Sequence, residues 1–395
     1  MLLRAAECEV KMKQEEIVSI IKEIADKNYD LFLLKGYAAP GNNGPYGHKD
    51  TPVRNTAHWL ITYAYLWKKT GDKKYEEIVK RFADYLIQGQ AKTQSGAIKC
   101  MYEEKFDHLN GLIGQAWVIE ALVYAATAFG REDYYETALK IFSVPRYNEK
   151  KHLWERVELD GTNIGFDYTF NHQLWLAAAG SLLLDYKYDK KTDLRIRDFL
   201  EGCLEHFRVH KNGLIKHYVN LKRPGHKVTC RSLIKKCLKF MCRPFKAIDP
   251  DRFDLSSYET GYHLFNLFGF ALLYNRYKDC MIFRTGAFRK ALAFGLDIKK
   301  LNRAFNIYNY LKRDNSRFIK FNKYSYAYNS PAFEYPYISK IFTNNCNDKI
   351  TAALFKLQME LTYDKTDKMF SRNNADEQTL TARLYELVRY LDTAW

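Results

Sequence analysis

The sequence lacks the motifs by which proteins usually hold metals. None of its eight cysteines forms a CxxC pair, and Cys237 and Cys242 stand five residues apart, a poor spacing for zinc ligands. Its ten histidines show no HExxH pattern, and no DDxxD motif is present, which argues against terpene-cyclase chemistry. We therefore expect no metal, no other cofactor, and the reduced thiols typical of a cytoplasmic protein.

Long apolar runs and nucleic-acid signatures are missing as well. No stretch of about 18 uninterrupted apolar residues occurs, so no membrane span is predicted. Arg4, Glu7 and Glu9 interrupt the first ten residues, so we expect no signal peptide. The net charge of +16 suits an anionic glycan, a lipid diphosphate or an acidic membrane surface. Without zinc-finger spacing, RNP-like motifs or a basic tail, nucleic acid is not an expected partner.

The chain contains a repeated helical hairpin. Residues 55–87, residues 110–142 and a segment from Asn171 onward resemble one another. Each carries a tryptophan near its start, and 58 residues separate successive members of the set Trp59, Trp117 and Trp175. The first helix of each hairpin is apolar on nearly all faces, whereas the second is amphipathic, as expected for a buried helix followed by a surface helix. Such hairpins must stack to bury their apolar faces.

Less regular segments extend this pattern to the end of the chain. Further inner helices are predicted at residues 256–277, 330–342 and 374–394, while the amphipathic helix at 13–30 has no inner partner before it. Pairing that first helix with the last would close a ring. We therefore predict one all-α domain over residues 1–395, an (α/α)6 toroid with six inner and six outer helices. Residues 285–325 remain unassigned, and a basic segment at about 208–249 is inserted.

Several segments resemble known families. The stretches "TPVRNTAHWLI", "NGLIGQAWVIEAL" and "DEQTLTARLYELVR" resemble AglQ-like proteins encoded in bacterial surface-polysaccharide clusters. The hairpin at 55–87 is similar, more distantly, to (α/α)6-barrel carbohydrate enzymes such as unsaturated glucuronyl and rhamnogalacturonyl hydrolases. The resemblance implies an enzyme of capsule, O-antigen or exopolysaccharide biosynthesis. Fold likeness alone does not fix the reaction.

Polar residues at the starts of the predicted inner helices are candidates for chemistry, because these helices should otherwise be apolar. In the resembling toroids these helix starts surround the active-site cleft. The predicted catalytic residues are Asp167, His172, Glu259, His263 and Glu334. Within this set, Asp167 with His172 and Glu259 with His263 combine an acid with an imidazole, and an aromatic setting predicts a raised pKa for Glu334. The predicted substrate-binding residues are Arg54, Asn55, His58, Asn110, Gln115, Trp117, Tyr168, Asn171 and Asp376.

Three functions remain open at this stage, and the first of them is the one that we predict. The first is a glycoside hydrolase acting on an anionic or lipid-linked glycan, which needs a protonated acid and a second carboxylate. The second is a uronate lyase or C5-epimerase, which needs a base for the proton α to the carboxylate. The third is a non-catalytic glycan-binding or assembly protein. The basic stretch at 227–247 suggests a peripheral contact with the inner face of the membrane.

Overall fold

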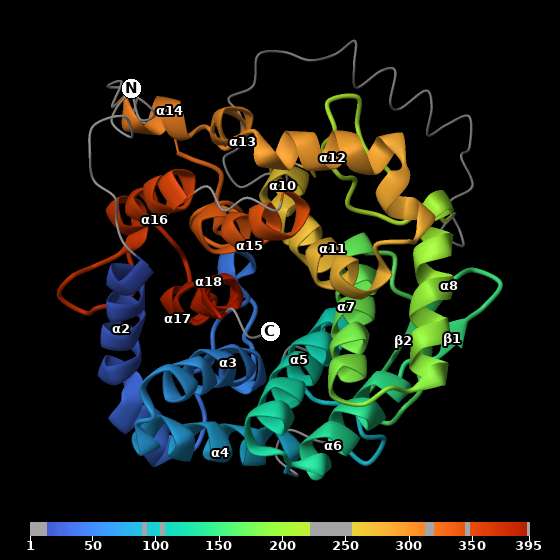
Figure 1. Ribbon diagram of the computed structural model, residues 1–395, viewed down its shortest axis with the longest axis horizontal. Helices are drawn as coiled ribbons and strands as arrows, with labels where there is room; N and C mark the ends of the chain where they lie inside the picture. The colour runs from blue at the N-terminus through green and yellow to red at the C-terminus, as the bar shows by residue number, and fades with distance from the viewer. Residues whose placement is uncertain are drawn as a thin grey trace.

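The helices form a closed ring around a central axis (Figure 1). The computed structural model describes residues 14–88, 93–102, 107–221, 255–312, 320–343 and 348–392. The inner wall consists of α3 (Val53–Thr70), α5 (Gly111–Phe129), α7 (Phe170–Tyr186), α11 (His263–Tyr277), α15 (Pro331–Thr343) and the pair α17 (Glu377–Ala382) and α18 (Leu384–Leu391). Each inner helix packs against the next, and α18 packs against α3, which closes the ring.

Outer helices surround this wall. They are α2 (Gln14–Lys35), α4 (Lys73–Ile87), α6 (Glu132–Ser143), α8 (Lys190–His206), α12 (Gly286–Leu296) and α16 (Asp348–Thr362). The short helices α13 (Ile298–Ala304) and α14 (Ile307–Leu311) continue from α12. The predicted (α/α)6 toroid is therefore confirmed, with the first described helix, α2, on the outside and the last, α18, on the inside.

The contrast between inner and outer helices follows from their sequences. In α5, every residue from Gly111 to Ala126 is buried, whereas α4 buries only one stripe that includes Ile78, Phe82 and Leu86. By length and composition alone α5 is apolar enough to cross a membrane, yet 83% of its apolar window is buried inside the ring. Its hydrophobicity is accounted for by packing against α3, α6 and α7.

Asp376 connects the last inner helices to the loop that precedes the first inner helix. It caps α17, where its Oδ1 accepts a hydrogen bond from the Thr379 N–H at 3.1 Å. Its Oδ2 accepts bonds from the backbone N–H groups of Asn42 at 2.7 Å and Gly44 at 2.9 Å. A Cβ at Gly41 would lie 2.7 Å from the Asp376 Oδ2, so this loop can approach the carboxylate only with glycine there. The last inner helix thus holds the loop that precedes the first.

The structure departs from the predicted pattern in four places. The inner helix predicted at 256–277 is broken at Tyr262 into α10 (Leu255–Gly261) and α11, and the inner helix predicted at 374–394 is broken at Arg383 into α17 and α18. The helices α12, α13 and α14 lie within residues 286–311 of the unassigned stretch, and the 3-10 turn η2 (Met281–Arg284) lies just before it. A small antiparallel sheet of β1 (Tyr147–Asn148), β2 (Leu153–Val157) and β3 (Asn163–Phe166) lies between α6 and α7.

The predicted basic insertion is described only in part. Residues 208–221 form a loop held by an isolated bridge between Val209 and Ile215 and by another between Thr169 and Tyr218. The stretch 227–247, for which we predict membrane contact, lies outside the described residues.

Candidate functional site

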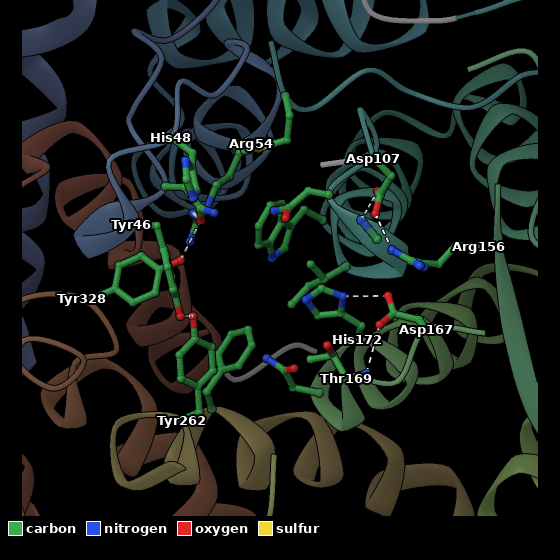
Figure 2. Close-up of a pocket in the computed structure, with 18 of the residues that line it drawn as sticks. Tyr46, His48, Arg54, Asp107, Arg156, Asp167, Thr169, His172, Tyr262 and Tyr328 are labelled. Carbon is green, nitrogen blue, oxygen red and sulfur yellow. Dashed lines mark hydrogen bonds and ion pairs between the residues drawn. The ribbon is translucent and has the colours of Figure 1, made fainter. Parts of the chain in front are cut away.

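A cavity of about 280 Å³ opens at the starts of the inner helices (Figure 2). Its lining comes from the beginnings of α3, α5, α7 and α11, from the junction of α17 with α18, and from the loops between them. The lining residues are Asn43, Tyr46, His48, Arg54, Met101, Asp107, Asn110, Gly111, Ile113, Trp117, Arg156, Asp167, Thr169, Asn171, His172, Tyr258, Tyr262, Phe265, Tyr328 and Arg383.

A histidine and an aspartate form a hydrogen-bonded pair on one wall. The His172 Nδ1 lies 2.7 Å from the Asp167 Oδ2, and the imidazole projects toward the middle of the cavity (Figure 2). The Asp167 carboxylate is buried and also accepts bonds from the N–H groups of Thr169 at 3.0 Å and Leu112 at 3.2 Å. Burial acts to raise the pKa of Asp167, but the His172 imidazole and these donors outweigh it and the pKa lies below its ordinary value. Asp167 is therefore a carboxylate that orients the imidazole.

Glycine at position 111 makes room for this pair. Gly111 adopts a φ of +61°, and a Cβ there would lie 2.4 Å from both the Asp167 Oδ2 and the His172 Nδ1. Asn110, which precedes it, also has a left-handed φ of 57° and forms no side-chain cap on α5. The start of α5 is therefore shaped to let the dyad of the neighbouring helix approach closely.

A second carboxylate, Asp107, stands beside the dyad. Its Oδ2 accepts a hydrogen bond from the Arg156 Nη1 at 2.9 Å, and its Oδ1 accepts one from the Gly111 N–H. Arg156 comes from β2, so the unexpected sheet contributes directly to the cavity. The sequence places Asp107 among the polar residues at the start of a predicted inner helix, but the selected site residues include neither it nor Arg156. Asp107 precedes Asp167 by 60 residues, close to the hairpin period, and this spacing is a signal that favours its selection.

Besides Arg156, two further arginines, Arg54 and Arg383, line the cavity. The guanidinium of Arg54 lies 4.3 Å from the Trp117 ring centroid, and its Nη1 donates to the Asn43 Oδ1 at 3.0 Å. Its Nε and Nη2 are buried without a hydrogen-bond partner. Arg383 lies over the same Tyr328 ring as Arg54, at 5.4 Å and 5.3 Å. Buried guanidinium donors without partners favour an anionic ligand here.

The carboxyl group of Asp50 balances the positive charge of Arg54 only in part. The Asp50 Oδ2 lies 3.7 Å from the Arg54 Nη1, outside hydrogen-bond distance. Burial raises the pKa of Asp50 to about 7, against the opposing effect of the Arg54 charge. Near neutral pH a substantial fraction of Asp50 is therefore uncharged, which leaves positive potential at Arg54.

Tyrosines form the wall opposite His172 (Figure 2). The hydroxyl groups of Tyr46 and Tyr262 lie 2.9 Å apart, and Tyr328 packs edge-on against both rings. Burial and the neighbouring Tyr262 raise the pKa of Tyr46 well above its ordinary value, so its hydroxyl keeps its proton. This wall offers hydroxyl groups and ring faces to a ligand.

Six of the predicted residues line the cavity together: Arg54, Asn110, Trp117, Asp167, Asn171 and His172. They come from three successive hairpins, in which Trp117 occupies a repeat position. The other two repeat tryptophans are buried among apolar rings, Trp59 against Phe32 and Trp175 against Phe265.

Three predicted catalytic residues lie outside the lining, and the expected pairing of Glu259 with His263 is not formed. Glu259 instead bonds the His210 Nε2 at 2.8 Å and the His217 N–H at 2.9 Å. The His263 Nε2 donates to the Ala291 carbonyl at 3.0 Å, and its Nδ1 accepts from the Ile215 N–H at 3.3 Å. Both side chains are thus engaged in holding loops and helices together.

Glu334, the third of these residues, is buried behind Arg383. The Arg383 Nη2 donates to Glu334 and to Glu386, each at 2.7 Å. Burial and the adjacent Glu386 carboxylate raise the pKa of Glu334 well above its ordinary value, in the direction expected from sequence. The geometry gives Glu334 contact with a cavity arginine rather than with the cavity.

The remaining predicted binding residues also lie outside the lining, and each has a structural contact. Asn55 donates to the Ala39 carbonyl, Gln115 bonds both backbone groups of Ile98, and His58 stacks on Tyr385 at 4.2 Å. The Tyr168 carbonyl accepts a hydrogen bond from the Val219 N–H, and the Asp376 carboxylate accepts one from the Asn42 N–H, as described above. Buried amides on inner helices here satisfy loop backbones, a role that sequence patterns do not distinguish from ligand binding.

Within the described ranges, no group of three or more His, Cys, Asp or Glu side chains is placed to hold a metal ion.

The comparison with known proteins identifies the family. No protein-family model matches the chain. The archaeal glycosylation protein Q of Haloferax volcanii is 31% identical over 380 residues, which cover 94% of this chain and 97% of that protein. The chain belongs to the archaeal glycosylation protein Q family. The resemblance to AglQ-like proteins is therefore confirmed. This relative is archaeal, so it does not support the bacterial setting that we expected.

Solved structures share the fold of this glycosylation protein Q homologue at low sequence identity. Cellobiose 2-epimerase from Spirochaeta thermophila superposes with a TM-score of 0.57 at 13% identity, covering 94% of this chain and 96% of that one. An inactive variant of the α-1,6-mannanase GH76A of Salegentibacter gives 0.53 at 11%, covering 95% and 98%. An unsaturated glucuronyl hydrolase specific for heparin gives 0.54 at 12%, covering 94% and 97%. These likenesses establish the toroid and leave the reaction open.

Proposed function

We propose that this protein is a carbohydrate-active enzyme that performs acid–base chemistry on a uronate-containing glycan in the cavity. The observation that carries the proposal is the His172–Asp167 dyad, whose imidazole projects into a cavity that also holds Arg54. The names of the relative and of the fold neighbours, which refer to glycosylation and to sugar epimerases and hydrolases, agree with a glycan substrate.

In this proposal His172 is the base. Its Nδ1–H donates to the ionised Asp167, which fixes the tautomer and leaves the Nε2 lone pair for a substrate proton. The imidazole takes the proton at C5, α to the uronate carboxylate, and becomes an imidazolium that Asp167 stabilises. Arg54 and Arg383 hold the carboxylate and stabilise the charge that develops on it as the C–H bond breaks.

Two outcomes can follow from the resulting enolate. If the C4–O bond, β to the carboxylate, breaks and the His172 imidazolium gives its proton to the departing oxygen, the products are an unsaturated uronate and a new chain end. Alternatively, a Tyr46 or Tyr262 hydroxyl, on the wall opposite His172, returns a proton to the other face of C5 and inverts it. The first is a lyase reaction and the second a C5-epimerisation, and both begin with the same proton transfer.

Glycoside hydrolysis is the second candidate, because two carboxylates, Asp107 and Asp167, line the same cavity. Hydrolysis requires one of them to carry a proton. Asp167 has a lowered pKa, and both oxygens of Asp107 accept bonds from the donors Arg156 and Gly111. The lowered pKa of Asp167 keeps that carboxyl group ionised, which favours the base-catalysed reactions.

The proposal includes a cellular setting. We assign the protein to the synthesis of a surface glycan at the inner face of the cytoplasmic membrane, with an anionic or lipid-linked oligosaccharide as substrate. Its support is the net charge of +16, the basic stretch at 227–247 and the glycosylation role named for the archaeal relative.

Product analysis tests this function. Uronate oligosaccharides are incubated with the protein, and ultraviolet absorbance, reducing ends and C5 configuration are recorded. An unsaturated chromophore or an inverted C5 supports the proposal, while new reducing ends without a chromophore identify a hydrolase. If no glycan is turned over by the wild-type protein, the catalytic proposal fails in favour of a binding protein.

A further inference from the structure

A row of aromatic rings leads from the cavity to the molecular surface. Tyr258, a lining residue, stacks on Tyr262 at 4.5 Å between ring centroids. On its other side the His217 ring lies edge-on to Tyr258 at 4.4 Å, and the Tyr218 ring lies 4.3 Å from His217. Tyr218 is 41% exposed. The row therefore ends in a ring that a ligand extending out of the cavity can contact.

The backbone independently places Tyr218 beside the cavity. Tyr218 forms an antiparallel bridge with Thr169, which lines the cavity. Residues that pair directly across antiparallel strands present their side chains on the same face. Two further bonds hold this register: the Phe170 N–H donates to the His217 carbonyl at 2.8 Å, and the Val219 N–H donates to the Tyr168 carbonyl at 3.0 Å.

Glu259 fixes the segment that carries these rings. One carboxylate oxygen accepts the His217 N–H at 2.9 Å, and the other bonds the His210 Nε2 at 2.8 Å. The carboxylate is buried, and it belongs to α10, the same helix that carries Tyr258. Glu259 thus couples the loop at 208–221 to the aromatic wall.

We propose that Tyr218 and His217 form a second sugar subsite continuous with the cavity, so that the substrate is an oligosaccharide rather than a single sugar. This inference rests on the function proposed above. The C–H groups on one face of a pyranose ring are weakly positive and pack against the negative face of an aromatic ring. Glu259 is a positioning residue for this subsite, acting through the His217 backbone.

Binding measurements test the subsite without requiring turnover. Isothermal titration compares methyl glucuronoside with a hyaluronan tetrasaccharide, which contains glucuronate, on the wild type and on Tyr218→Ala, Tyr218→Phe and Tyr188→Ala. Tyr188 is the matched control, since it is 63% exposed and follows the far end of α7. We expect Tyr218→Ala to weaken tetrasaccharide binding about tenfold, as loss of one ring contact would, and to leave the monosaccharide unchanged.

The remaining variants define the outcomes. Tyr218→Phe and Tyr188→Ala should bind the tetrasaccharide as the wild type does. Equal wild-type affinity for the two ligands, or equal losses in Tyr218→Ala for both, would overturn the subsite while the proposed function stands. Absence of wild-type binding to either ligand would overturn the proposed function and the subsite with it.

The role of Glu259 has its own readout. Glu259→Ala should lose the preference for the tetrasaccharide while it still binds methyl glucuronoside. Glu259→Gln keeps an oxygen that accepts the His217 N–H and should retain the preference. A general loss of both ligands in both variants would instead indicate a purely structural role and contradict the assignment.

Discussion

At the residue scale, the site depends on how one imidazole is held. His172 has a buried carboxylate on one side and the cavity on the other, and Gly111 provides the space for this arrangement. The sequence suggested Asp167 with His172 through their closeness on one segment, and the structure joins them by a hydrogen bond. It suggested Glu259 with His263 on the same grounds, but those side chains point to different partners because helix α10 ends at Gly261 between them.

Removing the imidazole should abolish the chemistry while the fold is kept. We expect His172→Ala to lower kcat by about 10²–10⁴-fold, the usual contribution of a positioned general base. Asp167→Asn should also lower kcat, because an amide supports the wrong tautomer. The control is His108→Ala, a half-buried histidine that pairs with Glu158 outside the lining. Wild-type kcat in His172→Ala would remove His172 from the mechanism.

The charge of Arg54 should select anionic sugars. Arg54→Met keeps an apolar stem against Trp117 but removes the buried donors. We expect the Kd of a glucuronide to rise about 10–100-fold, the value of a charge-assisted contact, with little change in the Kd of the corresponding neutral glucoside. Parallel titrations with the two glycosides check this. Equal weakening of both would mean that Arg54 supports the cavity shape rather than the anion.

At the element scale, hairpin periodicity was sufficient to predict the regular part of the ring. The regular Trp spacing marked the starts of α3, α5 and α7. The apolar character of these segments on all sides then identified them as inner helices. The β1–β3 sheet and the break at Tyr262 could not be predicted in this way, since both depend on tertiary contacts. A Cβ at Gly261, for example, would lie 2.3 Å from the Tyr324 Cβ, a contact that no local pattern reveals.

The packing of α11 against α12 and the loop at 208–221 should make the protein acid-sensitive. Burial lowers the pKa of His263 to about 4 from 6.5, although its bond to the Ala291 carbonyl opposes this. In the unfolded chain the His263 side chain therefore binds a proton below pH 6.5, whereas in the folded chain it binds one only below about pH 4. The contribution of His263 to the free energy of unfolding is constant above pH 6.5 and falls by about 3 kcal/mol as the pH drops toward 4.

His263→Gln isolates this contribution. Its amide can still accept from Ile215 and donate to Ala291, but it does not titrate. Urea unfolding of both proteins at several pH values between 7 and 4 should show a shallower loss of stability in the variant. Parallel curves would contradict the assignment, because the other groups that titrate in this pH range, such as Asp50, are common to both proteins.

At the scale of the whole molecule, closure of the ring brings distant parts of the chain to one cavity. Closure of the ring was predictable from the sequence, because the first outer helix and the last inner helix each lacked a partner. In the structure the closing contact is made by α18 against α3, and Gln14 of α2 donates a hydrogen bond to the Tyr390 hydroxyl of α18 at 3.1 Å. Arg383 could not be assigned to the site from sequence. It reaches the cavity only because α17 and α18 return to α3, where they also hold the loop that includes η1 (Gly44–Tyr46).

Asp376 should stabilise this closure. Asp376→Ala leaves the Asn42, Gly44 and Thr379 N–H groups without their acceptor, at an expected cost of about 1–3 kcal/mol or more in unfolding free energy. The matched control is Asp297→Ala, which removes a partly exposed cap of α13 and should cost about 1 kcal/mol. Urea unfolding of the two variants checks the difference. An equal cost would show that Asp376 acts only as a helix cap.

The most direct test of the proposed chemistry is the kinetic isotope effect at C5 of a uronate substrate. Lyase and epimerase reactions both break the C5–H bond at His172, whereas glycoside hydrolysis leaves it intact. We predict that a substrate carrying deuterium at C5 is turned over more slowly than its hydrogen counterpart by the wild-type protein. Turnover at the same rate for both substrates, accompanied by new reducing ends, would contradict proton abstraction by His172 and identify a hydrolase.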